Sequence, residues 1–314
     1  MNKQMKQLLN ELKKSENVLI LTHTSPDGDA LGSAVSLKCL LSKMNIKAEC
    51  IIDEAVPRQY TFLADEFIIK GETKKAYDLI IFVDCAGKDR CSVVYPQNIK
   101  TCGIDHHMSN LLDCDINILE EVSATAEIIY TLFCEYNIPL STEAAIGIYT
   151  GIYTDTGGFS FSNTTKITHE IAAVLCDFPF DRGYIAKKAY QEKSLVYSKI
   201  YSYIIENLIM LNDNKVAIGY LPYDVYTALG ATSDDTEGIS QVLRSIIGIE
   251  CGIFLTEKEK GIIKGSTRTN DLYSANDIAA IFGGGGHLRA AGFKTNLTFL
   301  EIKDKINEWI FANQ

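Results

Sequence analysis

The sequence lacks the features that mark several large protein classes. Its 314 residues contain no apolar run of the roughly 18 residues that a membrane-spanning helix needs. The amino terminus lacks the apolar core and small-residue cleavage site of a signal peptide. The nine cysteines are scattered and include no Cys-x-x-Cys pair, as expected for buried, reduced thiols. These absences predict a cytoplasmic protein.

Two further absences limit the substrate and the chemistry. The net charge is −10 and no basic stripe is visible, whereas proteins that grip long DNA or RNA use such stripes to neutralise phosphates. The sequence also has no Ser-His or Cys-His motif that would supply a protein nucleophile. The charge balance favours a small substrate that is bound locally, and the missing motif favours a reaction without a protein nucleophile. The 46% hydrophobic and 22% charged content is that of a soluble globular protein.

The first half of the chain alternates apolar strand patterns with helical ones. Continuous apolar runs separated by helices indicate a parallel sheet covered on both faces. One helix follows Asp29, which suits the N-cap position. The predicted strands are 18–22, 50–53, 79–84 and 101–105, and the predicted helices are 30–44, 123–136 and 141–153.

The rest of the chain predicts a smaller α/β domain. Residues 185–207 have the pattern of one long helix and are interpreted as a connector, so the expected domains are 1–184 and 208–314. A hairpin is predicted over 208–220, where two apolar runs flank an Asn-Asp-Asn turn. Further strands are predicted at 250–256 and 261–266, and helices at 236–246, 275–281 and 299–311.

The histidines are concentrated in short motifs. Four of the five lie in three such motifs, two of which also contain aspartates, and two further aspartates each end an apolar run. Imidazole and carboxylate groups are the ligand types of hydrolytic divalent-metal sites. The set comprises His23, Asp27 and Asp29; Asp84; Asp105, His106 and His107; Asp155; and His287, which ends the 283–286 glycine run.

Much of this set falls at the carboxyl ends of predicted parallel strands. Ligands bind outside those ends in such sheets, so His23, Asp84 and residues 105–107 are expected to share one site. The loop that carries Asp27 and Asp29 lets their side chains turn towards the same point. A pair of ions needs a bridging carboxylate, and Asp84 is best placed because it ends a central strand. Oxygen ligands with two imidazoles favour Mn²⁺, with Mg²⁺ or Co²⁺ as alternatives.

Each motif alone also has a purely structural interpretation, without metal binding or catalysis. Residues 27–29 are compatible with a turn and an N-cap, residues 105–107 with a polar loop, and Asp84 or Asp155 with a cap or a turn. The glycine run is compatible with a flexible turn, and Arg268 with surface charge. The joint occurrence of these residues, at strand ends and in this order, favours the metal site.

With these motifs, the sequence resembles the DHH family of phosphoesterases over nearly its whole length. The resemblance implies a parallel-sheet catalytic domain, a helical linker and a smaller α/β DHH-associated domain that binds substrate. In the second domain it is carried by Gly265-Ser-Thr-Arg268 and Gly283-Gly-Gly-Gly-His-Leu-Arg-Ala-Ala-Gly292. In the first domain it is carried by the His23 motif, Phe82-Val-Asp84, Gly103-Ile-Asp-His-His107, Ser123-Ala-Thr-Ala-Glu127 and Tyr153-Thr-Asp-Thr-Gly157.

The resemblance also implies a role for each site residue. His107 would face the substrate phosphate, Asp105 would support it from behind, and Asp84 would bridge two ions. One ion would be held by His23, Asp27 and Asp84, and the other by Asp29, Asp84, His106 and Asp155. The substrate would be bound by Arg268, Gly284, Gly285, Gly286 and His287.

The activity implied by the resemblance is phosphoester hydrolysis. Compact two-domain members of the family degrade short oligoribonucleotides to mononucleotides and convert 3'-phosphoadenosine 5'-phosphate (pAp) to AMP. The alternative is a soluble phosphodiesterase of pApA and cyclic-di-AMP turnover. A pyrophosphatase and a non-catalytic nucleotide-binding module are further hypotheses. The expected partners are short RNA and small nucleotides, with no long DNA and no membrane. Whether the chain forms a homodimer is left open by the sequence.

Overall fold

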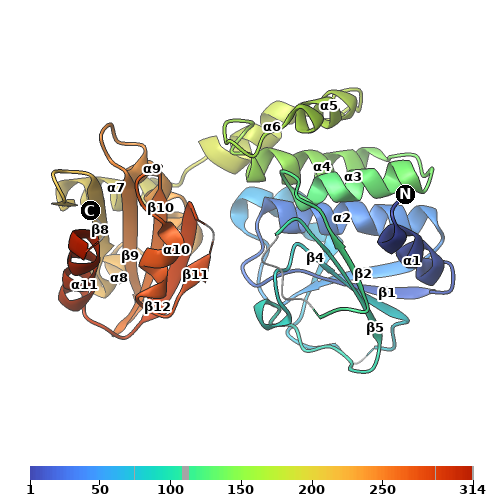
Figure 1. The fold of residues 1–314 in the computed structure, drawn as a ribbon, viewed down its shortest axis with the longest axis horizontal. Coiled ribbons are helices and arrows are strands. Elements are labelled where there is room, and N and C mark those ends of the chain that lie inside the picture. Colours follow the sequence, from blue (N-terminus) through green and yellow to red (C-terminus); the bar gives the residue numbers. More distant parts are fainter. Residues whose placement is uncertain (74, 108–112, 287, 313–314) are drawn as a thin grey trace. The chain divides into compact units, whose positions relative to one another are not determined.

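The chain forms two compact units, Met1–Glu192 and Lys193–Gln314 (Figure 1). The computed structural model describes residues 1–73, 75–107, 113–286 and 288–312. None of the helices in these described ranges is long and apolar enough to cross a membrane.

The first unit contains a six-stranded parallel sheet with the strand order β3-β2-β1-β4-β5-β6. This confirms the predicted parallel α/β fold. Its central strands are nearly continuous runs of buried apolar residues, which is typical of parallel sheets. The strands are β1 (Asn17–Leu21), β2 (Lys47–Ile52), β3 (Phe67–Ile69), β4 (Leu79–Val83), β5 (Lys100–Asp105) and β6 (Ile116–Leu119).

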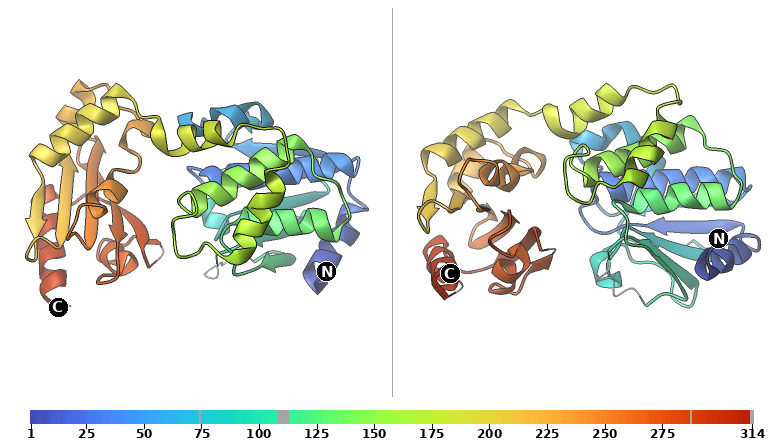
Figure 2. Two further views of the ribbon diagram at one scale, coloured as in Figure 1. Left: turned by 90° about the horizontal axis from the view of Figure 1, so that it is seen from above. Right: turned by 45° about the horizontal axis from the view of Figure 1, so that its top comes forward.

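One face of this sheet is covered by helices, which pack side by side over it (Figure 1; Figure 2). The opposite face packs against irregular segments that contribute Tyr77, Cys85, Val93 and Cys114. The sheet is therefore covered on both faces as predicted, but the α-helices of the described residues cover one face. The helices are α1 (Lys3–Leu12), α2 (Gly28–Lys43), α3 (Thr125–Glu135), α4 (Thr142–Asp155) and α5 (Lys166–Leu175), with a 3₁₀ segment η1 (Arg58–Glu66).

The second unit contains a mixed six-stranded sheet with the order β11-β12-β10-β9-β8-β7. Only the β8–β9 pair is parallel among its described strands, and β7 with β8 forms the predicted hairpin. The strands are β7 (Ile209–Leu211), β8 (Val216–Leu221), β9 (Cys251–Glu259), β10 (Ile262–Thr269), β11 (Gly285–Gly286) and β12 (Ala290–Thr295).

Helices cover both faces of the second sheet. Buried residues of α10 and α11 pack on one face, and those of α7 and α9 pack on the other. This agrees with the predicted smaller α/β unit. The helices are α7 (Leu195–Glu206), α8 (Tyr223–Ala228), α9 (Ile239–Arg244), α10 (Ala275–Ala280) and α11 (Phe299–Ala312).

The predicted single helix over 185–207 is wrong, because the chain forms separate helical segments there. Helix α6 (Arg182–Ala186) runs into a π-helical turn that ends at Gln191, and α7 starts anew at Leu195. The Ser194 hydroxyl accepts a hydrogen bond from the Tyr197 amide at 2.8 Å, which makes it the N-cap of α7. The apolar face of α7 is buried in the core of the second unit, so α7 is part of that unit.

Candidate metal centre

The candidate centre lies at the carboxyl ends of three adjacent parallel strands, β1, β4 and β5. His23 follows β1, Asp84 follows β4, and Asp105 ends β5. Because these strands are neighbours in the sheet, their ends bring the three side chains to one edge. His106 and His107 continue from β5 into the same region.

Asp27, rather than Asp29, is the N-cap of α2. Its Oδ1 accepts hydrogen bonds from the backbone amides of Asp29 at 3.0 Å and Ala30 at 3.1 Å. The prediction that Asp29 caps the helix was therefore wrong by two residues. Asp29 lies in the first turn of α2, where only 1% of it is exposed. The carboxylates of both aspartates consequently have fixed orientations.

The Asp29 carboxylate is held by groups from two helices. Its Oδ1 accepts hydrogen bonds from the Ser33 hydroxyl at 3.1 Å and the Ala126 amide at 3.0 Å, and its Oδ2 accepts one from the Thr125 amide at 2.6 Å. The amides belong to the start of α3, whose partial positive charge favours an anion there. Gly151 of α4 leaves room for the carboxylate, since a Cβ at this position would lie 2.6 Å from Asp29 Oδ1.

Asp84 is the centre of the cluster and is only 2% exposed. Its Oδ2 lies 3.7 Å from His23 Nε2, and its Oδ1 lies 3.8 Å from His106 Nε2 and 3.5 Å from His107 Nδ1. The Thr125 hydroxyl donates to Asp84 Oδ1 at 2.9 Å. The backbone of Asp84 has a φ of 52°, a left-handed conformation that costs energy and is frequent at functional sites.

Two histidines present their Nε2 atoms to the carboxylates. His23 Nδ1 lies 2.7 Å from the Thr24 carbonyl oxygen, and His106 Nδ1 lies 3.2 Å from the Val122 carbonyl oxygen. A carbonyl oxygen only accepts hydrogen bonds, so each Nδ1 carries the proton and each Nε2 lone pair is available. Backbone partners of this kind orient histidines that ligate metals.

The donor atoms form overlapping groups in which all atoms lie within 4.8 Å of one another. His106 Nε2 is 3.6 Å from Asp155 Oδ2, which is beyond hydrogen-bond distance. Donors bound to one ion at about 2.0–2.2 Å each would lie roughly 3–4 Å apart, and the distances from Asp84 to His23 and His106 are 3.7 and 3.8 Å. The donor set therefore fits divalent cations. The groups are His23, Asp27 and Asp84; Asp29, His106 and Asp155; and Asp84, Asp105, His106 and His107.

Burial and mutual repulsion raise the pKa of three carboxyl groups in this cluster. Desolvation is the largest cause for Asp29, Asp84 and Asp155, followed by the charge of a neighbouring aspartate, and each pKa is raised to about 7. Cations bound between these groups would remove the repulsion and keep all three ionised.

We therefore expect metal ions to stabilise the chain more at pH 8 than at pH 6. Each of these carboxyl groups has a higher pKa in the folded chain than its ordinary pKa of about 3.9, so its protonated form favours the metal-free fold. This contribution to stability is fully present below about pH 3.9 and is lost as the pH rises through about 7. Metal ions compete with protons for these groups and so bind better at pH 8. Thermal unfolding with EDTA or Mn²⁺ at the two pH values tests this. A Tm increase that is no larger at pH 8 would contradict the expectation.

His107 is paired with a fully buried carboxylate. Asp105 Oδ1 lies 2.7 Å from His107 Nδ1 and also accepts a hydrogen bond from the His107 amide at 3.1 Å. Burial by itself lowers the pKa of His107, but the hydrogen bond to Asp105 and the charge of Asp84 outweigh it and raise this pKa to about 9. The pair therefore favours a protonated imidazole.

The described substrate residues predicted for the second unit lie on β10 and at β11. Arg268 is half-buried on β10, and Gly284 packs directly on β12, where a Cβ would lie 2.3 Å from the Gly292 carbonyl oxygen. Gly285 and Gly286 are exposed, and the Gly286 amide donates to Asn276 Oδ1 at 3.0 Å. The glycine run is thus not a flexible turn, because Gly285 and Gly286 form the short strand β11 that pairs with β12. His287 lies outside the described residues.

Sequence reasoning missed the contribution of Thr125. This residue was part of a motif that carried the family resemblance, but it received no role. Its amide bonds to Asp29 and its hydroxyl to Asp84, so it orients two central carboxylates at once. The available signal was a threonine at the start of a predicted helix, where amides are free to bind anions.

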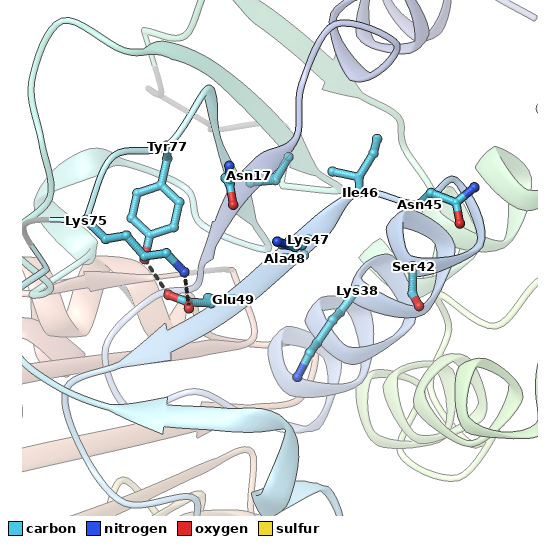
Figure 3. A pocket seen from close by; sticks show the side chains of 11 residues that line it. Asn17, Lys38, Ser42, Asn45, Ile46, Lys47, Ala48, Glu49, Lys75 and Tyr77 are labelled. Atoms are coloured by element: carbon cyan, nitrogen blue, oxygen red, sulfur yellow. Dashed lines mark hydrogen bonds and ion pairs between the residues drawn. The ribbon is translucent and has the colours of Figure 1, made fainter.

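A cavity of about 470 Å³ lies at the opposite end of β1 and β2, at their amino ends (Figure 3). Two of the lysines that line it are paired with glutamates: Lys38 Nζ with Glu66 Oε2 at 2.8 Å, and Lys75 Nζ with Glu49 Oε1 at 2.5 Å. None of the predicted site residues lines this cavity. The candidate centre is therefore separate from this cavity and is identified by the arrangement of its donor atoms.

Comparisons with known proteins agree on one family. Residues 17–152 match the DHH family, N-terminal domain, and residues 213–311 match the DHHA1 domain. The bifunctional oligoribonuclease and PAP phosphatase NrnA of Bacillus subtilis is 28% identical over 291 residues, which cover 91% of each chain. The uncharacterized MG371 homolog of Mycoplasma pneumoniae is 30% identical over 91% of this chain and 88% of its own. The crystal structure of an exopolyphosphatase-related protein from Bacteroides fragilis has a TM-score of 0.90 at 25% identity, covering 99% of this chain and 98% of that one.

Proposed function

The chain belongs to the DHH family, and from this premise we propose that it is a metal-dependent phosphoesterase. Its proposed reactions are the hydrolysis of short oligoribonucleotides to mononucleotides and of pAp to AMP. The observation that carries the proposal is the pair of adjacent ligand groups at one sheet edge, centred on Asp84 and His106. The named activities of the Bacillus subtilis relative, which matches over 91% of both chains, support this choice of substrates.

We assign the ligands of two divalent ions to side chains of this edge. His23, Asp27 and Asp84 would hold one ion, and Asp29, Asp84, His106 and Asp155 the other. Divalent ions bound there supply Lewis-acid stabilisation of phosphate charge and lower the pKa of the attacking water. The mixture of carboxylate oxygens and two imidazoles fits Mn²⁺, and Mg²⁺ or Co²⁺ would serve as alternatives.

Asp105 and His107 are proposed to act on the substrate as a pair. Asp105 fixes Nδ1 of the imidazole, which leaves Nε2 with a proton to donate to a phosphate oxygen. Such a donor stabilises the charge that develops on the phosphate and can protonate the leaving oxygen. No protein nucleophile is required for this hydrolysis.

The second unit is proposed to bind the remainder of the nucleotide. Arg268 would donate to a phosphate, and Gly284, Gly285 and Gly286, together with His287, would bind a sugar, base or phosphate. The exposed backbone of Gly285 and Gly286 allows close approach of a ligand. The same proposal includes a cytoplasmic location, which is supported by nine free cysteines.

The decisive experiment is a panel of substrates supplied with Mn²⁺. We expect turnover of pAp and of RNA dinucleotides to pentanucleotides, with little activity on long RNA. Preference for pApA or cyclic-di-AMP without pAp turnover would instead support the cyclic-dinucleotide phosphodiesterase. Release of phosphate from inorganic pyrophosphate alone would support a pyrophosphatase. No hydrolysis of any member, with Mn²⁺, Mg²⁺ or Co²⁺, would contradict the proposed function.

A further inference from the structure

The 122–125 segment, which leads into α3, contacts ligands that come from distant parts of the chain. The His106 ring donates through Nδ1 to the Val122 carbonyl oxygen, and the His106 amide donates to the Thr125 hydroxyl at 3.3 Å. The amide and hydroxyl of Thr125 also donate to the two buried carboxylates of α2 and β4 that this residue orients. One short segment therefore fixes three ligands at once.

Asn163 extends these contacts to a fourth ligand, Asp155. Its Nδ2 donates to the Ser123 carbonyl oxygen at 3.1 Å and to the Asp155 carbonyl oxygen at 3.2 Å. Since Asp155 is the last residue of α4, this amide joins the segment to the end of that helix. The segment is thus bonded, directly or through Asn163, to every ligand assigned to one ion, named the Asp155 ion: Asp29, Asp84, His106 and Asp155.

The other ion, named the His23 ion, has ligands with separate supports. His23 donates to the Thr24 carbonyl oxygen, and Asp27 accepts from amides of α2. Within the described part of the chain, no hydrogen bond joins either ligand to the 122–125 segment. Asp84 serves both ions, but the segment bonds to its Oδ1, on the side of His106, whereas its Oδ2 faces His23.

A buried hydrogen bond holds the segment in place. The Ser123 hydroxyl donates to Glu127 Oε1, and both residues are at most 2% exposed. Ala124, the N-cap residue of α3, has no side-chain group that could fix the start of the helix. Neither Ser123 nor Glu127 belongs to a described ligand group. Their hydrogen bond therefore acts on the ligands only through the position of the segment.

Metal affinity depends on how firmly the donor atoms are held before the ion binds. Side chains that orient the ligands are typically worth 10–100-fold in metal affinity. The segment orients all four ligands of the Asp155 ion, so loosening the segment should weaken this ion strongly. The His23 ion shares only Asp84 with that set and should be affected little.

We propose that Ser123, Glu127 and Asn163 are positioning residues for the Asp155 ion. This inference rests on the proposed function, to which both ions belong. It adds that the affinities of the two ions are set by different parts of the chain. The affinity of the Asp155 ion depends on a buried hydrogen bond and an asparagine amide that touch neither ion.

The test measures Mn²⁺ binding to each ion separately by isothermal titration calorimetry. His23→Asn removes a ligand of the His23 ion alone, and Asp155→Asn removes a ligand of the Asp155 ion alone. Ser123→Ala is then added to each. We expect it to raise the Kd of the Asp155 ion by about 10–100-fold and that of the His23 ion by less than about twofold. Equal effects on the two ions, or no effect on the Asp155 ion, overturn the inference.

Electron paramagnetic resonance gives a second measurement in the otherwise wild-type chain. Two Mn²⁺ ions that share the Asp84 carboxylate couple magnetically. At a Mn²⁺ concentration that fills both sites of the wild type, the Ser123→Ala chain should show the spectrum of a single, uncoupled ion. A coupled pair at the wild-type level overturns the inference. If the wild type itself binds no Mn²⁺, the proposed function fails.

Ser36→Ala is the matched control, because Ser36 is also a fully buried serine of the first unit. Its hydroxyl donates to the Gly32 carbonyl oxygen at 2.7 Å and to the Ala144 carbonyl oxygen at 3.0 Å, and it bonds to no ligand. This variant should lower the Tm and leave the Kd of both ions within about twofold of wild type. A loss of the Asp155 ion in this control would show that general destabilisation is sufficient, and would overturn the inference.

Two further variants test the other positioning residues. Glu127→Gln keeps an oxygen that accepts from Ser123, so its Kd for the Asp155 ion should lie between those of the wild type and Ser123→Ala. Asn163→Ala changes an exposed residue and should also weaken the Asp155 ion. If Ser123→Ala fails to fold, an unchanged Kd of the Asp155 ion in Asn163→Ala overturns the inference.

Discussion

Replacing Asp84 with asparagine is expected to lower kcat by about a thousandfold or more while the chain stays folded. Asp84 is the residue assigned to both metal ions, and its carboxylate is buried between three histidines. Asparagine preserves the size of the side chain and still accepts a hydrogen bond from Thr125. It also tolerates the left-handed backbone at this position better than most residues. The substitution therefore removes little except the negative charge that the ions need.

Asp53→Asn is the matched control for this variant. Asp53 follows β2 at the same edge of the sheet, but it is exposed, its carboxylate accepts a hydrogen bond from Ser92, and it belongs to none of the described ligand groups. Turnover of pAp and thermal unfolding should be measured for both variants. We expect near wild-type turnover from Asp53→Asn. Substantial metal-dependent activity in a folded Asp84→Asn chain would rule out the bridging role.

Replacing His107 with asparagine is expected to lower kcat by about 10²–10⁴ with little change in metal content. The asparagine amide can keep the hydrogen bond to Asp105, whereas the second ring nitrogen, which would face the phosphate, is lost. The loss should appear in kcat because a proton donated to the developing charge acts in the transition state. Steady-state kinetics on pAp, together with metal analysis of the purified variant, measures both quantities.

His169→Asn serves as the control for His107. His169 is exposed on α5, its ring stacks on Phe159 at a centroid distance of 5.4 Å, and it belongs to none of the described ligand groups. This variant should retain its activity. If His107→Asn loses its metal ions together with its activity, His107 is a ligand, and the role given to it is wrong.

The position of the site could be predicted from sequence because parallel strands run in the same direction and their carboxyl ends lie at the same edge of the sheet. Once three apolar runs were identified as strands of one parallel sheet, His23, Asp84 and Asp105 were expected at the same edge. That the three strands are neighbours is seen only in the structure. Strands β3 and β6 were missed because three and four residues are too few for a periodic pattern.

Other details depend on tertiary packing that a linear pattern does not encode. Both Asp27 and Asp29 are good N-cap residues, and the choice between them depends on α3, whose amides bind the Asp29 carboxylate from almost a hundred residues away. The break at Ser194 was also hidden, because the helical pattern continues on both sides of it. The cover of irregular segments over one face of the first sheet has no periodicity to detect.

The most direct measurement is anomalous diffraction at the manganese edge from crystals grown with Mn²⁺. Two peaks about 3.5–4 Å apart are expected on either side of the Asp84 carboxylate. One should be bound by His23 and Asp27, and the other by Asp29, His106 and Asp155. Crystals of active protein with no manganese at this edge of the sheet, or with the ions bound elsewhere, would contradict the assignment of this site as the metal centre.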